Sequence, residues 1–468
     1  MFLNLHSQNL GSISGKVFNN ETGLFLEGAT IQVENTDFFA TTDSNGYFEI
    51  SNLPTSSYNI KASFIGFKSL TKYNVIVKSV GNQSLLYDLN PFSEELDEVI
   101  VFESPFKTSI ETPLSTQTFS ATEIETYPGG NNDITRVIQS LPGISPSLGG
   151  FRNDIIIRGG GPNETVYYID GIEIPNINHF STQGSSGGPV GLINVSFIKD
   201  VTLTTSSFGA EYDNALSGVL SFEQKEPNLD KISGNFRIGS SEAGLTFEGP
   251  LNLFSDKETS FIFSVRRSYL QFIFKAFGFS FLPDYWDYQM KIKHKIDDFN
   301  YINFIGIGSI DKLTVNESDE FNFENESQIE QIPIINQETQ TFGISWKRIY
   351  KNQSGYFNFS ISNNRLKNNF ERFGNNVLKT NVSYSNISNE NETKIRFISN
   401  KNIDKYKLSY GGNLQLSNYL NTTQFDFYNI NYKSKIDLIK YGFFVKSSGT
   451  FINLSLIHIS EPTRLWTI

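Results

Sequence analysis

The chain has 468 residues, of which 38% are hydrophobic, 19% charged and 14% aromatic, and it contains no cysteine. This length supports several domains, and the hydrophobic content excludes a disordered chain. The lack of cysteine excludes disulfides, thiolate metal sites and cysteine nucleophiles. A formal net charge of -11 disfavours nucleic acid as a partner. The most apolar stretch, residues 269–282, is shorter than the roughly 18 residues of a spanning helix and contains Lys275, so any membrane crossing must use strands.

The two ends of the chain are interpreted as lying outside its domains. Residues 1–10 lack a basic start and a long apolar run, and we interpret them as the remnant of a signal peptide. Residues 454–468 include LSLIHISEPTR, which looks like the translation of a transposase adaptor used in sequencing libraries. We therefore interpret 454–468 as a non-native tail, and a natural amphipathic tail is the alternative.

Residues 11–92 contain short apolar runs about ten residues apart, a spacing that predicts a small β-sandwich. The segment DSNG at 43–46 resembles part of a calcium loop, but a glycine that closes a hairpin is the preferred interpretation. The predicted strands are 13–17, 29–33, 47–50, 58–62 and 75–77.

Several segments of this region resemble the carboxypeptidase-regulatory-like domain. They are GKV at 15–17, LEGATIQV at 26–33, DSNGYFEI at 43–50, LP at 53–54 and the stretch 58–67. The resemblance implies a prealbumin-like β-sandwich without catalytic residues, which serves docking or assembly.

Residues 93–103 form a linker that contains EELDEVIVF at 94–102, an acidic start that runs into a β-branched stretch. An extended segment without glycine or proline can add to the edge of another sheet, so we predict that it recruits a partner chain. Pairing within the preceding sandwich is the alternative.

Residues 104–226 predict a compact mixed α/β unit. An amphipathic helix is expected with Asn132 as its N-cap and Pro142 at its end, and the pair Asp170-Gly171 predicts a hairpin turn. The apolar face of the helix consists of Ile134, Val137, Ile138 and Leu141.

Three candidate site motifs in this unit are weak. Ser186 lies in a G-x-S-x-G pattern, but the strand that must precede a nucleophile elbow is missing. The glycines 159–161 lack the Lys-Ser/Thr of a phosphate loop, and His179 has no second metal ligand nearby, so a solvated or capped histidine is expected. We predict no enzyme activity, no catalytic or metal site and no cofactor.

The order of six short motifs is more informative than any one of them. They are LPGI at 141–144, DIIIRGG at 154–160, YIDGI at 168–172, IKDV at 198–201, FGAEYDN at 208–214 and LSGV at 216–219. In this order they resemble the plug domain of TonB-dependent outer-membrane receptors, with the N-terminal extension common in Bacteroidota. The segments 160–164 and 174–180 depart from the starch-utilisation subgroup, which disfavours glycan import.

This resemblance implies roles for two sets of residues. The plug motif comprises Arg158, Gly159, Asp170 and Gly171. The TonB box comprises Asp97, Glu98, Val99, Ile100 and Val101. Arg158 ends an uncharged run, and we expect it to tether the plug to carboxylates of the plug or the wall; a solvated charge at a strand end is the alternative.

Residues 227–453 alternate polar and apolar side chains in segments of about ten residues, as transmembrane β-strands do. A soluble antiparallel sandwich would show the same alternation. The long polar connection 316–340 and the aromatics near the predicted strand ends favour the membrane. The clearest segments are 288–296, 342–346, 357–361 and 406–416. The aromatics expected to form interfacial girdles are Tyr285, Trp286, Tyr301, Tyr350 and Tyr419.

The predicted fold class is mainly β, with a prealbumin-like β-sandwich, a small mixed α/β plug and an incomplete antiparallel transmembrane β-barrel. Plugged barrels of this kind have about 22 strands, whereas this stretch supplies about eight to ten. We therefore interpret the chain as the N-terminal part of a receptor.

The resemblance implies a receptor in the cell outer membrane of a Gram-negative bacterium that imports a scarce solute, such as a ferric siderophore. The implied partners are the TonB energy-transducing protein, outer-membrane lipid, an unknown small solute and a surface lipoprotein. The alternative is a non-transporting surface adhesin or signalling receptor whose N-terminal sandwich recruits a partner.

Overall fold

The computed structural model divides the chain into two compact units, Met1–Phe102 with Lys351–Gly355, and Glu103–Tyr350 with Tyr356–Ile468. The predicted TonB box and Ser186 lie outside the residues that the structure describes. The described residues are 10–20, 22–34, 36–77, 83–91, 116–130, 133–146, 153–181, 187–228, 231–239, 241–251, 259–316, 329–350, 355–403, 406–451 and 455–467.

The first unit is the predicted β-sandwich, with one sheet in the order β4-β1-β7 and the other in the order β3-β2-β5-β6. Its apolar core includes Ile13, Phe48, Ile60 and Tyr87, each at most 1% exposed. Strands β3 and β7 were not predicted. The strands are β1 (Leu10–Asn19), β2 (Thr30–Val33), β3 (Phe39–Thr41), β4 (Tyr47–Pro54), β5 (Ser57–Ser63), β6 (Leu70–Ile76) and β7 (Gln83–Leu89).

The segment 43–46 is a turn, as predicted. Gly46 has a φ of 66° and the Asp43 carboxylate accepts hydrogen bonds from the backbone N–H groups of Asn45 and Tyr47, at 2.9 and 2.8 Å. The carboxylate therefore stabilises the hairpin backbone.

The second unit begins with the mixed α/β plug, built on a five-stranded sheet in the order β12-β11-β16-β15-β8. None of the helices in the described part of the chain is long and apolar enough to cross a membrane. The plug elements are β8 (Thr116–Ser120), α1 (Ala121–Thr126), α2 (Ile134–Gln139), β9 (Ile144–Ser145), β10 (Ile156–Ile157), β11 (Thr165–Ile169), β12 (Ile172–Ile174), β13 (Asn178–His179), β14 (Val190–Gly191), η1 (Val195–Phe197), β15 (Ile198–Thr204) and β16 (Gly218–Gln224).

Helix α2 is the predicted amphipathic helix, but its N-cap is Asp133 rather than Asn132. The Asp133 side chain accepts from the backbone N–H of Thr135 at 2.9 Å. It also accepts from the backbone N–H of Gly191 at 3.1 Å and from the Asn153 amide. Tertiary contacts therefore fix the cap one residue later than the helical period alone predicts.

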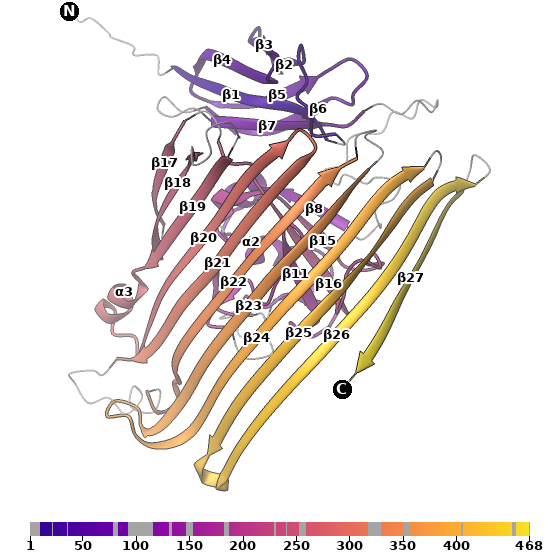
Figure 1. The fold of residues 1–468 in the computed structure, drawn as a ribbon. Helices are drawn as coiled ribbons and strands as arrows, with labels where there is room; N and C mark the ends of the chain where they lie inside the picture. The colour runs from indigo at the N-terminus through magenta and orange to yellow at the C-terminus, as the bar shows by residue number, and fades with distance from the viewer. Residues whose placement is uncertain are drawn as a thin grey trace, which may run out of the picture. The chain divides into compact units, whose positions relative to one another are not determined.

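After the plug the chain forms an 11-stranded antiparallel sheet, from β17 to β27 in chain order, which is an incomplete β-barrel (Figure 1). Segment 454–468, which we left out of the sequence-based fold, contains β27. The strands are β17 (Ser233–Ile238), β18 (Glu242–Pro250), β19 (Thr259–Ser268), β20 (Phe281–Asp297), β21 (Asn300–Val315), β22 (Ile334–Ile349), β23 (Gly355–Asn375), β24 (Thr380–Ile403), β25 (Tyr406–Phe425), β26 (Ile430–Phe451) and β27 (Ser455–Thr467).

The outer face of this sheet carries an apolar band. On β22 the outward side chains Phe342, Ile344 and Trp346 are 37%, 53% and 38% exposed, whereas the neighbouring residues Thr341 and Ser345 are buried. This alternation confirms the predicted pattern of transmembrane strands. Strands β20 to β26 have 16 to 24 residues rather than about ten, because they continue beyond the apolar band with polar side chains on both faces.

The expected aromatic girdle is wrong at three positions. Tyr301 lies on the same face of β21 as the inward residues Ile305 and Ile307, with its ring centre 4.8 Å from Nζ of Lys293. Tyr285 is fully buried on the inner face, where its hydroxyl donates to Glu242 at 2.9 Å. Tyr419 also donates to a carboxylate, that of Glu392, whereas Trp286 is 47% exposed on the outer face. Tyr285 and Tyr419 carry a hydroxyl that needs a partner when it is buried, and the inner face supplies one.

The connections distinguish the two ends of the barrel. At one end β20 and β21 are joined by residues 298–299 and β24 and β25 by residues 404–405. At the other end, helix α3 (Leu270–Ala276) lies between β19 and β20, and residues 316–333 join β21 to β22. The predicted loop 316–340 is shorter because β22 begins at Ile334. Short connections are typical of the periplasmic end and long ones of the external end.

Candidate functional site: the contacts between plug and barrel wall

The plug lies within the curve of the 11-stranded sheet, as Figure 1 shows, and contacts its inner face. The apolar core cluster of the plug includes Ile305 and Ile307 of β21, and in the described residues it takes in no other wall side chain. The plug also packs closely against the wall at Gly343, which has no side chain. A Cβ added to Gly343 would lie 2.3 Å from Cδ1 of Ile172. Most of the remaining contacts are polar.

One polar contact is the His179 clasp, formed by His179, Asp287 and Asp311. The plug residue His179 is fully buried, with Nδ1 2.7 Å from Asp311 and Nε2 3.2 Å from Asp287. Burial alone lowers the pKa of His179, but Asp311 and Asp287 outweigh burial and raise the pKa to about 9. The imidazole is therefore charged at neutral pH and links β13 to strands β20 and β21. Of the two expected states, solvated or capped, the solvated one is wrong, because both ring nitrogens of the buried His179 contact a carboxylate.

The wall side of the clasp is held by Arg266 of β19. Its Nε donates to Asp287 at 2.8 Å, and its Nη1 donates to Glu242 at 3.0 Å. Its Nη2 donates to the plug carbonyl oxygen of Leu192 at 2.7 Å. Nη2 also donates to the carbonyl oxygen of Gly191 at 3.3 Å, so one planar guanidinium binds two wall carboxylates and two plug carbonyls.

A second contact joins the plug turn at Asp170 to β20. The Asp170 carboxylate lies 3.0 Å from Nζ of Lys291 and accepts from the backbone N–H of Gln224 at 2.9 Å. Glu226, at the exit of the plug, lies 3.5 Å from Lys291 and 2.7 Å from Lys293. Burial raises the pKa of Glu226, but the two lysines outweigh it and hold the pKa at about 2.

A third contact is made by β24. Nζ of Lys394 lies 2.8 Å from the plug carboxylate of Glu173 and 2.8 Å from Glu392 of the wall. Arg396 donates to the plug carbonyl oxygens of Gly171 and Glu211, at 3.2 and 2.6 Å. Two wall cations on one strand therefore bind the plug hairpin at its turn, Gly171, and in the strand that follows, at Glu173.

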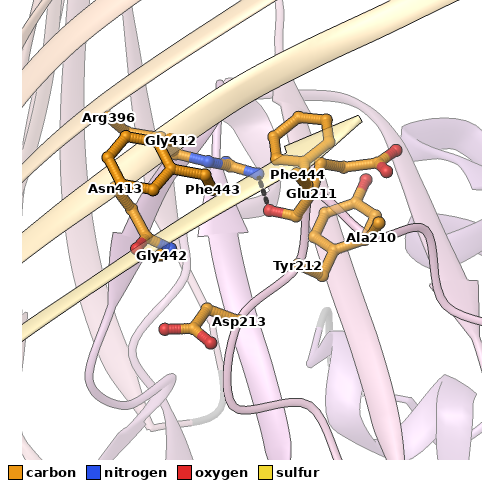
Figure 2. Close-up of a pocket in the computed structure, with 10 residues that line it drawn as sticks. All are labelled: Ala210, Glu211, Tyr212, Asp213, Arg396, Gly412, Asn413, Gly442, Phe443 and Phe444. Carbon is orange, nitrogen blue, oxygen red and sulfur yellow. Dashed lines mark hydrogen bonds between the residues drawn. The ribbon is translucent and has the colours of Figure 1, made fainter. Parts of the chain in front are cut away.

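Arg396 also stacks on plug aromatics and borders a small cavity. Its guanidinium carbon lies 4.9 Å from the ring centre of Tyr168 and 5.8 Å from that of Tyr212. Figure 2 shows the hydrogen bond to Glu211 beside the cavity, which is lined by plug residues 210–213 and by strands β24 to β26. Its volume of about 30 Å³ has room for one or two water molecules and excludes a larger solute.

A fourth contact is made by Lys440 of β26, whose Nζ lies 2.7 Å from the plug carboxylate of Asp213 and also contacts the Asn214 amide. The side chain of Lys440 is 6% exposed. In these contacts the cation comes from the wall and the carboxylate from the plug. The signs are reversed in the His179 clasp and at Lys225 of the plug, whose Nζ lies 3.3 Å from Glu248 of β18.

The four predicted plug-motif residues differ in their contacts: two form a turn against the wall, and Arg158 is exposed. Asp170 and Gly171 have φ of 47° and 83° and form the predicted hairpin turn, and Asp170 also ties the plug to the wall. Arg158 is exposed, with a φ of 50°, and takes part in none of the ion pairs of the described residues. Gly159 follows it with a φ of 81°. The expected tether at Arg158 is therefore wrong, because this side chain points to solvent at the end of a strand.

Sequence reasoning missed the wall residues of these contacts. Lys291 was expected on the polar face of its strand, but its partner Asp170 is 121 positions earlier in the chain. The usable signal was a charged side chain at an inward position of a membrane strand, which needs a partner inside the lumen. In the described part of the chain, no group of three or more His, Asp or Glu side chains could hold a metal ion.

Comparisons with known proteins agree with this arrangement. Residues 13–101 match the family model of the CarboxypepD_reg-like domain, and residues 108–219 match that of the TonB-dependent receptor plug domain. None of the curated proteins is significantly similar to the chain in sequence.

Several solved structures are similar in fold. The siderophore receptor PirA from Acinetobacter baumannii has 14% identity and a TM-score of 0.55, covering 74% of this chain and 56% of that one. A mutant of the ferric enterobactin receptor PfeA from Pseudomonas aeruginosa has 12% identity and a TM-score of 0.55, covering 75% and 57%. The copper transporter OprC has 11% identity and a TM-score of 0.50, covering 72% and 52%.

The chain thus spans just over half of the length of these structures, and identities this low show a shared fold. The chain contains a CarboxypepD_reg-like domain and a TonB-dependent receptor plug domain, and its remaining strands have the fold of the barrels of TonB-dependent siderophore receptors.

Proposed function

We propose that the protein is an outer-membrane receptor that imports a scarce solute, with the plug as a gate. In this proposal the TonB energy-transducing protein adds a strand to residues 97–101 and pulls. Main-chain hydrogen bonds along an added strand can bear such a pull. The pull separates the plug from the wall and opens a path for the solute.

The observation that carries the proposal is the set of wall cations paired with plug carboxylates, namely Lys291 with Asp170, Lys394 with Glu173, and Lys440 with Asp213. Each charged hydrogen bond contributes about 1.5 to 3 kcal/mol. Such contacts hold the plug at rest and can break one after another under load. A continuous apolar interface would resist separation as a unit.

The external end of the inner face offers a surface for the solute. Four aromatic rings follow one another there, with Phe370 5.8 Å from Tyr384, Tyr384 5.6 Å from Phe425, and Phe425 4.9 Å from Tyr428. Aromatic faces bind flat or apolar groups. Together with the fold shared with siderophore receptors, this row favours a ferric siderophore as the solute.

The test uses a strain that lacks the gene and carries the full-length receptor. Growth on defined iron, cobalamin and glycan sources identifies the solute, and a siderophore-bound iron source should restore growth. In Val99→Pro the backbone N–H of the added strand is missing, so uptake should be lost while solute binding persists. Val99→Ala keeps the N–H and should import normally. Undiminished uptake by Val99→Pro would refute the proposed role of this segment.

A further inference from the structure

The backbone of Phe180, beside the His179 clasp, is held in an unfavourable conformation. Its φ is 54°, in the left-handed region that L-residues with bulky side chains rarely adopt. In this region the Cβ atom crowds the following carbonyl oxygen, a cost that glycine avoids. Of the non-glycine residues with a positive φ in the described part of the chain, Phe180 is the only one with a large apolar side chain. The turn at Phe180 is therefore strained.

Contacts with the barrel wall hold Phe180 in this conformation. The backbone N–H of Phe180 donates to Oδ2 of Asp311 at 3.0 Å, while Nδ1 of His179 lies 2.7 Å from Oδ1 of the same carboxylate. The carbonyl oxygen of Ser181 accepts from Nε2 of Gln337 at 2.7 Å. Three consecutive plug residues are thus bound to strands β21 and β22. The left-handed turn allows the His179 ring and the Phe180 N–H to meet one carboxylate side by side.

The side chain of Phe180 also contacts the wall. Phe180 is 5% exposed, and its ring centre lies 6.3 Å from that of Tyr285 in an edge-to-face arrangement, which is favourable for aromatic pairs. The ring of Tyr285 packs against the His179 imidazole as well, with the ring centres 4.1 Å apart. These contacts compensate for the backbone strain only while the plug is seated against the wall.

When the plug leaves the wall, Phe180 loses these contacts and its backbone can return to an ordinary conformation. The strain therefore raises the free energy of the seated plug and lowers the free energy needed to separate it from the wall. Glycine would adopt the same turn without this cost. We propose that Phe180 is a positioning residue that orients His179 in the clasp and, through its strained backbone, lets the clasp open under a moderate pull. The inference rests on the proposed function of the plug as a gate.

The test compares Phe180→Ala with Phe180→Gly in the full-length receptor. Both variants lack the ring, so they differ only in the Cβ atom that creates the strain. We expect a higher urea midpoint of plug unfolding for Phe180→Gly, and about fivefold slower unfolding of its plug at the same urea concentration. Phe180→Asn, whose side chain tolerates the left-handed region, should also be more stable than Phe180→Ala. A fluorophore on Glu125→Cys reports the unfolding.

Arg136, an exposed residue of helix α2, supplies the matched control. Within an α-helix glycine is less stable than alanine, so the plug of Arg136→Gly should unfold at a lower urea concentration than that of Arg136→Ala. Opposite orders at the two positions would identify the strain at Phe180. A general effect of glycine on the plug would give the same order at both positions.

Initial rates of solute uptake connect the strain to the gate. Phe180→Gly should import at least twofold more slowly than Phe180→Ala, with equal solute binding, because its plug leaves the wall less readily. The inference is overturned if Phe180→Ala is as stable as Phe180→Gly, or if both import at the same rate in cells whose unchanged receptor imports. Failure of the unchanged receptor to import would refute the proposed transport alone. The unfolding rates of the two variants would then still decide whether Phe180 is strained.

Discussion

The charge of His179 is set by two aspartates that come from different wall strands. Its pKa of about 9 lies above the ordinary value of about 6.5, because the carboxylates of Asp311 and Asp287 outweigh the burial that opposes the charge. Arg266, 2.8 Å from Asp287, and the ring of Tyr285, 4.1 Å from the imidazole, complete its surroundings. The clasp therefore stabilises the plug most when His179 is protonated.

This charge predicts a pH dependence of plug stability. The raised pKa means that the stabilisation is fully present below about pH 6.5 and is lost as the pH rises through about 9. His179→Gln should cost about 3 to 5 kcal/mol at pH 6, since it leaves two buried carboxylates without this partner. The measurement is the urea midpoint of plug unfolding, read from a fluorophore on a single introduced cysteine, Glu125→Cys.

His294→Gln, on the wall and away from the plug, is the matched control for this experiment. It should leave both the midpoint and its pH dependence unchanged. A wild-type plug whose stability is the same at pH 6 and pH 10 would contradict the charged clasp.

Two plug-motif residues should behave in opposite ways. Asp170→Asn keeps the shape of the side chain and tolerates the left-handed backbone, but it removes the charge that pairs with Lys291. We expect the plug to loosen and the sensitivity of cells to large antibiotics to rise in the complete receptor. Arg158→Ala should leave sensitivity unchanged, because Arg158 is exposed and belongs to none of the described ion pairs. Equal sensitivity of the two variants would argue against the tie at Asp170.

At the level of elements, the strands and helices that show a regular polar and apolar pattern could be predicted from the sequence. Contacts between residues far apart in the chain could not. The alternation of polar and apolar side chains correctly predicted strands within β20, β22, β23 and β25. The helical spacing of apolar residues correctly predicted α2. Their lengths were underestimated, because alternation fades where both faces of a strand meet water. The Asp170-Gly171 turn was predicted for its backbone shape alone, and its partner Lys291 could be assigned only from the folded chain.

The close packing of β12 against β22 depends on Gly343, which has no side chain. A Cβ at Gly343 would lie 2.3 Å from Cδ1 of Ile172, so Gly343→Val should press the plug away from the wall. Overpacking of this kind costs about 1 to 3 kcal/mol. The urea midpoint of plug unfolding should fall accordingly.

Two further variants check the steric origin of that effect. Ile172→Ala in the Gly343→Val background should restore most of the lost plug stability, because the smaller alanine leaves room for the valine side chain. Gly239→Val, at a position where an added Cβ meets only a carbonyl oxygen at 3.6 Å, should have little effect. A loss that Ile172→Ala fails to relieve would contradict the steric account.

At the scale of the whole molecule, the N-terminal sandwich and the plug with its barrel strands are separate compact units. This division allows transport and recruitment to be tested apart. A receptor without residues 11–90 should keep solute uptake if transport resides in the plug and barrel. Loss of all activity with an intact barrel would favour the alternative of an adhesin or signalling receptor.

The central claim is that the plug must leave the wall before solute can pass. The chain has no cysteine, so the double variant Ile172→Cys/Gly343→Cys can form a single disulfide between plug and wall. An added Cβ at Gly343 lies 3.2 Å from Cγ1 of Ile172, within reach of a disulfide. The measurement is uptake of the identified solute by cells that carry this full-length variant, before and after reduction. The account predicts no uptake with retained binding in the oxidised state and recovery on reduction; equal uptake in both states would contradict it.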